Sequence, residues 1–256
     1  MTAAAASGNN RRGIYILPSL FTTGGLFCGF YALIAAIQGR YEVAAWAIII
    51  AAFFDMLDGR IARLLHAESA FGAEYDSLCD MVSFGIAPAV LVYMWALTPM
   101  NKLGWLAAFL IAACAALRLA RFNVQVGTAD KRYFQGLPTP ATAGLIATAV
   151  LFHEERGFAP FNGLWFAVAV ALALLMVSNV RFFSGKDVDL QRRRPFVALV
   201  MMLMFITFVM IDHSFTLFAL MSLYVLHGPV VSVWQRQRAA RFRIERRLHK
   251  GEGDGH

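Results

Sequence analysis

The stretch "DMLDGRIARLLHAESAFGAEYDSLCD", residues 55–80, decides how the rest of this chain is interpreted. It holds four aspartates, two glutamates and two arginines, and it stands between the apolar runs "AAWAIIIAAFF" (44–54) and "MVSFGIAPAVLVYMWAL" (81–97). Ionisable side chains beside hydrocarbon are costly, and inside membrane proteins they usually mark functional sites. The four aspartates are therefore the first candidates for a site.

The composition around this stretch is that of a membrane protein. The chain has 256 residues, of which 59% are hydrophobic and 15% charged, and its mean hydropathy is +0.59. Soluble domains are about half apolar and about a quarter charged. The net charge of +7 reflects topology rather than nucleic-acid binding, because the basic residues stand mainly at the ends of apolar runs.

The apolar segments predict an all-α, polytopic helical bundle with about eight transmembrane helices. Each segment is near the ~20 residues that cross a bilayer core. They cover roughly 17–38, 42–65, 73–98, 103–126, 137–152, 161–183, 196–211 and 214–234. The chain then divides into a disordered polar N-terminus (1–13), one membrane domain (14–234) and a basic cytoplasmic tail (235–256).

The distribution of Lys and Arg predicts the orientation. With both termini in the cytoplasm and eight crossings, 20 of the 23 Lys and Arg residues fall on the cytoplasmic side, and Arg40, Lys102 and Arg156 fall on the other. Such a bias is the positive-inside pattern. It also places the aspartates at the cytoplasmic face.

The spacing of the aspartates predicts one shared site. Asp55 and Asp58 are three residues apart, and Asp76 and Asp80 are four apart, so each pair projects from one face of a helix. Four carboxylates in a low-dielectric pocket require protonation or cations. Hard divalent ions prefer oxygen ligands, and two such ions can clamp a phosphoryl centre.

Residues beside the aspartates suit a phosphate-bearing ligand. Gly59, Ala62 and Gly72 are small and leave room next to the carboxylates, and Arg63 suits a phosphate. The alternative is that the aspartates are solvated loop acids at the membrane boundary, but their helical spacing argues against it.

The order of these residues resembles the complete signature of the CDP-alcohol phosphotransferase family. The matching residues are Asp55, Asp58, Gly59, Ala62, Arg63, Gly72, Asp76 and Asp80. The resemblance implies a six-helix core plus two helices, a homodimer, and two divalent metal ions (Mg²⁺ or Mn²⁺). It also implies transfer of a phosphatidyl or similar group from a CDP-linked donor to an alcohol.

Further stretches resemble the phosphatidylserine synthase branch of that family. They are "FGAEYDSLCDMVSFGIAPA" (71–89), "ALRLARFNV" (116–124), "FQGLPTPATAG" (134–144) and "LMVSNVRF" (175–182). The implied substrates are CDP-diacylglycerol and L-serine, with phosphatidylserine and CMP as products. The chain departs from the family at Ser19 and Gly25, where Asn is common, so Ser19, Thr22 or Thr23 must supply any polar contact there.

The resemblance also implies a role for each site residue. Asp55, Asp58 and Asp76 would be metal ligands, and Asp80 would both bind metal and act as the general base. Residues that would bind CDP-diacylglycerol are Gly59, Ala62, Arg63 and Gly72.

The serine carboxylate needs a cationic partner near this site. Arg118 and Arg121 are three residues apart at the cytoplasmic end of one predicted span, and Arg181 and Lys131 are further candidates. The alternative for all four is anchoring at the membrane interface.

Other interpretations remain open at this point. Within the family, the acceptor could instead be glycerol 3-phosphate or choline. A divalent-cation transporter is the alternative from another class of protein. The basic tail is equally consistent with binding to anionic lipid and with simple anchoring. The expected location is the bacterial cytoplasmic (inner) membrane, with the active site facing the cytoplasm.

Overall fold

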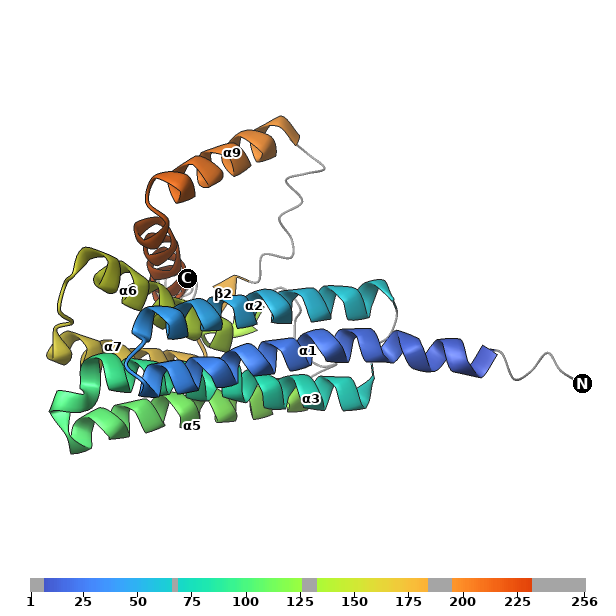
Figure 1. The fold of residues 1–256 in the computed structure, drawn as a ribbon, viewed down its shortest axis with the longest axis horizontal. Helices are drawn as coiled ribbons and strands as arrows, with labels where there is room; N and C mark the ends of the chain where they lie inside the picture. Colours follow the sequence, from blue (N-terminus) through green and yellow to red (C-terminus); the bar gives the residue numbers. More distant parts are fainter. Residues whose placement is uncertain (1–6, 66–68, 126–132, 184–194, 232–256) are drawn as a thin grey trace, which may run out of the picture.

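The computed structural model describes residues 7–65, 69–125, 133–183 and 195–231. These residues form helices, apart from one short pair of strands and the connecting turns (Figure 1). The described residues are thus almost entirely helical, as expected for the predicted membrane protein. Four helical stretches in the described part are long and apolar enough to cross a membrane. They are Leu17–Ile37, Ala70–Met100, Lys102–Val124 and His213–Val231.

Helices α1 (Ser7–Ile37) and α2 (Tyr41–Leu64) form an antiparallel pair. Alanines line their contact: Ala32, Ala35 and Ala36 on α1 and Ala44 and Ala45 on α2 are almost fully buried. Small side chains allow helices in a membrane to approach closely. Helix α1 begins at Ser7, so residues 7–13, which were expected to be disordered, are helical here.

One continuous helical stretch follows. Helix α3 (Ala70–Asp80) leads through the π-helical segment η1 (Met81–Ile86), α4 (Ala87–Val92) and the π-helical segment η2 (Tyr93–Leu97). A short 3₁₀ turn, η3 (Thr98–Met100), joins it to α5 (Lys102–Gln125). The π-helical segment η1 lies directly after Asp80, and single π turns inside helices are frequent at functional sites.

Helix α6 (Thr139–Arg156) lies at the centre of the bundle. Its residues from Leu145 to Leu151 are all buried, and a helix that is apolar on every side is expected in a core. It ends at Gly157, whose φ of +65° is a left-handed conformation that closes the helix.

Helix α7 (Asn162–Val177) is shorter than the predicted segment 161–183. The prediction is wrong at this end because Ser178 leaves the helical conformation and its hydroxyl donates to the carbonyl of Leu175. The chain then forms β2 (Arg181–Phe183), which pairs antiparallel with β1 (Tyr133–Gln135).

The last two helices lie on one side of the bundle. Helix α9 (Pro195–Ile211) stands away from the other helices in Figure 1, and most of its large apolar side chains are exposed, as expected for a lipid-facing helix. Asp212 follows it and begins the helix His213–Val231, because its carboxylate accepts from the backbone N–H of Phe215 (2.9 Å).

The connections alternate between the two ends of the bundle. The turns that follow α1, η3 and α6 lie at one end, on the left in Figure 1, and α2 and α3 are joined at the other. The left end contains Arg40, Lys102 and Arg156, the three basic residues that the charge count separates from the rest. The aspartates lie toward the opposite end.

Candidate active site

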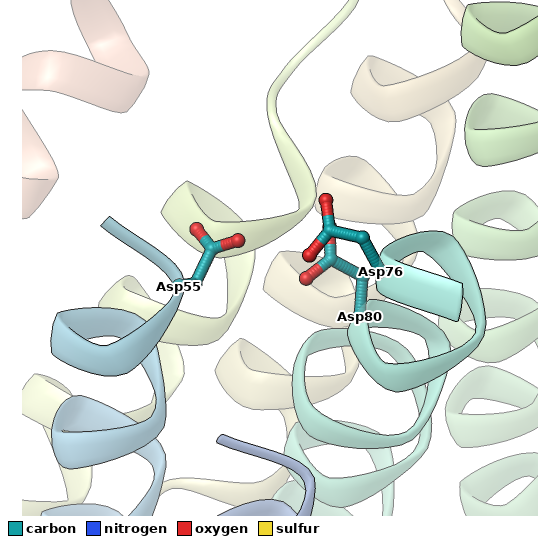
Figure 2. A group of neighbouring side chains, drawn as sticks. All are labelled: Asp55, Asp76 and Asp80. Carbon is teal, nitrogen blue, oxygen red and sulfur yellow. The ribbon is translucent and has the colours of Figure 1, made fainter. Parts of the chain in front are cut away.

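Two helices bring three aspartates together. Asp55 comes from the second half of α2, and Asp76 and Asp80 come from α3. One carboxylate oxygen from each lies within 4.8 Å of the others, and Figure 2 shows Asp55 pointing across the gap toward the other two. These oxygens are close enough together to share a divalent cation.

Asp58 lies beside this group without being part of the closest three. Its side chain is only 6% exposed, and it lines the same small pocket as Asp55, Asp76 and Asp80. Its Oδ2 atom is buried and has no hydrogen-bond partner among the described residues. A buried carboxylate oxygen without a partner is costly. Because a bound cation would remove that cost, the four side chains fit a divalent metal centre.

The position of α3 is set by contacts on both of its sides. Ser69 caps its start, with Oγ accepting from the backbone N–H of Gly72 (3.0 Å). On the α5 side, Ser77 donates to Asn123 (3.1 Å), and the amide of Asn123 donates to Glu74 (3.3 Å). Asn123 therefore connects α3, which carries Asp76 and Asp80, to α5.

A second, larger cavity of about 270 Å³ adjoins the aspartates. It is lined by Pro18, Ser19, Thr22, Asp58, Gly59, Ala62, Ser69, Gly72, Ala73 and Asp76. Thr22, Asp58 and Asp76 line both cavities, so the two are neighbours. The small residues expected beside the donor, Gly59, Ala62 and Gly72, are all found here.

Arg63 does not line either cavity. It is exposed, and its Nε donates to the carbonyl oxygen of Gly59 one turn earlier (2.7 Å). In this conformation its guanidinium lies on its own helix rather than among the aspartates.

Thr22 lies between Ser19 and Gly25, the two positions at which the sequence departs from the family that it resembles. Its hydroxyl donates to the carbonyl of Pro18 (3.1 Å), and it also interacts with the Asp58 carboxylate. Ser19 lines the larger cavity, whereas Thr23 is directed to the hydroxyl of Tyr75 (2.9 Å). Of the three candidates named from the sequence, Thr22 alone contacts both cavities.

Arg118 and Arg121 lie on α5, three residues apart. Arg118 donates to the hydroxyl of Thr139 (3.2 Å) and interacts electrostatically with Asp80. Arg121 donates to the carbonyl of Val177 (3.0 Å). Each also has one buried nitrogen, Nε of Arg118 and Nη1 of Arg121, without a hydrogen-bond partner in the part of the chain that the structure describes. Two part-buried cations with free donors form a suitable environment for an anion.

The structure does not bring the other two cationic candidates, Arg181 and Lys131, to the aspartates among the residues that it describes. Arg181 lies on β2, opposite Gln135 of β1, rather than at the end of a helix. Lys131 lies outside the described residues.

The sequence did not single out two side chains of this region. Asn123 was only part of a quoted stretch, and Cys79 lines the aspartate pocket although no role was predicted for it. Thr22 was named only as one of three options. The position of Cys79 between Asp76 and Asp80, one residue before the latter, was the available signal for it.

The part of the sequence that holds these residues matches a known family. The family model described as CDP-alcohol phosphatidyltransferase matches residues 15–175, which include all four aspartates and both α5 arginines. The chain belongs to the CDP-alcohol phosphatidyltransferase family. The match ends before α9 and the helix His213–Val231.

Relatives within the family have named activities. The CDP-diacylglycerol–serine O-phosphatidyltransferase of Helicobacter pylori (strain 26695) is 33% identical over 219 residues, covering 85% of this chain and 91% of the relative. The enzyme of that name from Bacillus subtilis is 33% identical over 167 residues, covering 65% of this chain and 89% of the relative. The archaetidylserine synthase of Methanothermobacter thermautotrophicus is 34% identical over 173 residues, covering 65% and 69%.

Proposed function

We propose that this protein transfers the phosphatidyl group of CDP-diacylglycerol to the hydroxyl of L-serine, forming phosphatidylserine and CMP. The observation that carries the proposal is the convergence of the aspartates next to a cavity lined by Gly59, Ala62 and Gly72. The names of the relatives support serine as the acceptor. The two bacterial enzymes and the archaeal enzyme are named for different lipids, but all three names contain serine.

Asp55, Asp58, Asp76 and Asp80 would hold two divalent ions, Mg²⁺ or Mn²⁺. The unpartnered Oδ2 of Asp58 and the close carboxylates of the other three support this assignment. When bound, the ions would offset negative charge on the pyrophosphate and stabilise the charge that develops as CMP leaves.

Asp80 is the proposed general base. The serine hydroxyl oxygen attacks the β-phosphorus, Asp80 accepts the hydroxyl proton, and the bond from that phosphorus to the bridging oxygen breaks. The electron pair of that bond stays with CMP. Asp80 suits the role because it lines the aspartate pocket and interacts electrostatically with Arg118, so a serine held by the arginine would lie near it.

The larger cavity would bind the donor. Gly59, Ala62 and Gly72 leave space for the nucleotide close to the helix backbone, and Thr22 supplies a hydroxyl at the junction of the two cavities. Arg63 would reach the pyrophosphate by releasing the carbonyl of Gly59, which an exposed side chain can do at little cost.

Arg118 and Arg121 would bind the serine carboxylate. Their buried, unpartnered nitrogens are donors that a carboxylate can satisfy. Arg181 and Lys131 remain further candidates for the same role.

Steady-state release of CMP tests this function. Purified protein in detergent, given CDP-diacylglycerol and Mn²⁺ or Mg²⁺, is expected to release CMP when L-serine is added. Glycerol 3-phosphate and choline serve as competing acceptors. Faster turnover with either of them than with serine would overturn the acceptor assignment, and no CMP release with any alcohol would favour the cation-transporter alternative.

The proposed topology has eight crossings with both termini in the cytoplasm. The bacterial inner membrane, with the site facing the cytoplasm, is the proposed location, and the basic tail would lie near anionic lipid. Labelling of single cysteines at Phe158 and Val188, in a background lacking the three native cysteines, tests the orientation. Phe158 is chosen because Gly157 has a positive φ that a cysteine would strain. Labelling of both positions from the same side would contradict the eight-crossing arrangement.

A homodimer is also proposed, on the family resemblance alone. Mass measurement of the detergent-solubilised protein by light scattering would test it, and a monomeric mass would contradict it.

A further inference from the structure

The helical stretch that begins with α3 and the helix α5 form a hairpin, and two contacts determine how far apart they lie. At the inner contact, a Cβ atom at Gly85 in η1 would lie 3.2 Å from the Cβ atom of Ala115, so the backbones are close. The outer contact is a hydrogen bond between side chains, from the hydroxyl of Ser77 to Oδ1 of Asn123 (3.1 Å). In the described part of the chain, α5 packs closely on η1 but makes few close contacts with α3 itself.

The two contacts follow one antiparallel register. They are eight residues apart on each helix, at positions 77 and 85 on one and at 115 and 123 on the other. Equal intervals are expected for antiparallel helices, because each helix rises by about 1.5 Å per residue. The first interval contains Asp80, and the second contains Arg118 and Arg121. The proposed general base and the proposed carboxylate-binding arginines therefore lie in the part of the hairpin between the two contacts.

Asn123 has a second bond to the same helix. Its amide nitrogen donates to Oε2 of Glu74 (3.3 Å), which lies one turn before Ser77 on α3. The amide thus uses both its acceptor and its donor on α3, which fixes its orientation. None of these three side chains lines either cavity, so the connection between α3 and α5 lies outside the proposed donor site.

The separation of α3 and α5 matters for a short acceptor. A bound serine would have to place its hydroxyl at Asp80 and its carboxylate at the arginines at the same time. Only two carbon atoms separate these groups in serine, so both contacts form only at one separation of the helices. Each arginine has a buried nitrogen without a partner among the described residues, which a carboxylate at the right distance can satisfy.

We propose that Asn123 is a positioning residue that sets the separation between Asp80 and the two arginines. Through that separation it matches the site to an acceptor of the length of serine. The proposal rests on the function proposed above. Because Asn123 acts between α3 and α5 and away from the donor cavity, its loss is expected to change acceptor selectivity and not donor binding.

Asn123→Ala in the full-length protein tests the proposal, with CMP release measured for L-serine and for L-homoserine, which has one additional methylene. The serine KM is expected to rise by about three- to tenfold, the effect of losing a hydrogen bond. The ratio of kcat/KM for serine to kcat/KM for homoserine is expected to fall by about fivefold or more. The CDP-diacylglycerol KM should change by less than about twofold. An unchanged ratio would overturn the proposal, because a general loosening weakens both acceptors equally.

Tyr75→Phe is the matched control. Tyr75 is also on α3, and its hydroxyl is hydrogen-bonded to that of Thr23 on α1 (2.9 Å). The variant therefore loses one bond between helices but keeps the connection from α3 to α5. Its selectivity ratio is expected to stay within about twofold of the wild type. A fall as large as that in Asn123→Ala would show that any loosening of α3 has this effect, and would overturn the specific role.

A complementary pair of substitutions tests the route independently of Asn123→Ala and of its folding. Asn123→Asp keeps an acceptor for Ser77 but replaces the donor to Glu74 by a carboxylate oxygen, so the selectivity ratio is expected to fall. Adding Glu74→Gln supplies a donor in return and is expected to restore most of the ratio. A ratio that does not recover would overturn the proposed route.

The same experiments separate this proposal from the proposed function. If the wild-type protein releases CMP faster with another alcohol than with serine, the proposed function falls. The role of Asn123 is then decided by the same variants with that alcohol and with its homologue that is longer by one methylene. An unchanged ratio for that pair would overturn the role of Asn123 as well.

Discussion

Asp55 on α2 and Asp80 on α3 place carboxylate oxygens within 4.8 Å of each other, although they come from different helices. Two like charges at this separation in a pocket between helices repel strongly unless something neutralises them. The close approach of the two carboxylates therefore indicates a cation-binding site. Substitutions of single aspartates can then distinguish a metal ligand from the general base.

Asp80→Asn is expected to lower kcat by about 10²–10⁴-fold, the usual effect of losing a general base. Asn keeps the size of Asp but cannot take the serine proton, so added Mn²⁺ should not restore the rate. Binding of CDP-diacylglycerol should persist, which a binding measurement with the variant would check. Near-normal kcat with only a shifted metal requirement would make Asp80 a ligand alone.

Asp58→Asn is expected to behave differently from Asp80→Asn. Loss of one ligand charge should raise the Mn²⁺ concentration needed for half-maximal rate, and excess Mn²⁺ should recover part of the activity. Glu42→Gln is the control, because Glu42 is exposed in the first turn of α2 and lines neither cavity. Its metal dependence should equal that of the wild type. A shift in Glu42→Gln as large as that in Asp58→Asn would contradict a metal-binding role for Asp58.

Arg121→Ala is expected to raise the serine KM by about tenfold or more, and the CDP-diacylglycerol KM by much less. The reason is the loss of a charge-assisted hydrogen bond to the carboxylate. Both constants are obtained by varying each substrate in turn. Arg40→Ala, at the other end of the bundle, should change neither. A donor KM that rises instead would assign Arg121 to the pyrophosphate.

The sequence alone identified the helices and the aspartates because both depend on local patterns. Apolar segments of bilayer length located most helix ends to within a few residues, apart from the start of α1 and the end of α7. The spacing of Asp76 and Asp80 put both on one helix face. The end of α7 was misplaced because the polar break at Ser178 and Asn179 is short and has apolar residues on both sides.

The remaining features depend on contacts between distant segments. No local sequence pattern predicts that Arg63 donates to the carbonyl of Gly59. The same is true of the hydrogen bond between Ser77 and Asn123. The close approach of Gly228 to Phe182 likewise joins segments far apart in the sequence. Such packing cannot be derived from periodicity.

Gly29→Ala is expected to destabilise the protein by about 1–3 kcal/mol, the usual cost of overpacking. A Cβ at Gly29 would overlap the hydroxyl of Ser83 and lie 2.7 Å from its Cα. That would also disturb the bond from Ser83 to the carbonyl of Gly25 (3.2 Å), next to Asp80. The midpoint of thermal unfolding measures the effect. Gly163→Ala, where the nearest atom would be 3.5 Å away, is the control, and equal midpoints for the two variants would contradict the argument.

Asp212 should make the stability depend on pH in acid. The backbone N–H of Phe215, with Arg156 nearby, lowers the pKa of Asp212 below its usual value of 3.8. Its charged form therefore stabilises the fold fully above the unfolded pKa, and this contribution is lost as the pH falls through the lower folded pKa. The wild type should unfold at a higher temperature than Asp212→Asn at pH 6, and the difference should shrink below pH 3.8. A difference that did not change with pH would mean that the charge has no such role.

The most direct test of the central claim is the fate of the serine hydroxyl oxygen. The protein is given CDP-diacylglycerol and L-serine with ¹⁸O in the hydroxyl, and the molecular mass of the lipid product is measured by mass spectrometry. Attack by that oxygen on phosphorus predicts phosphatidylserine that retains the ¹⁸O label, formed together with CMP. Unlabelled phosphatidylserine, or phosphatidic acid as the product, would contradict the account.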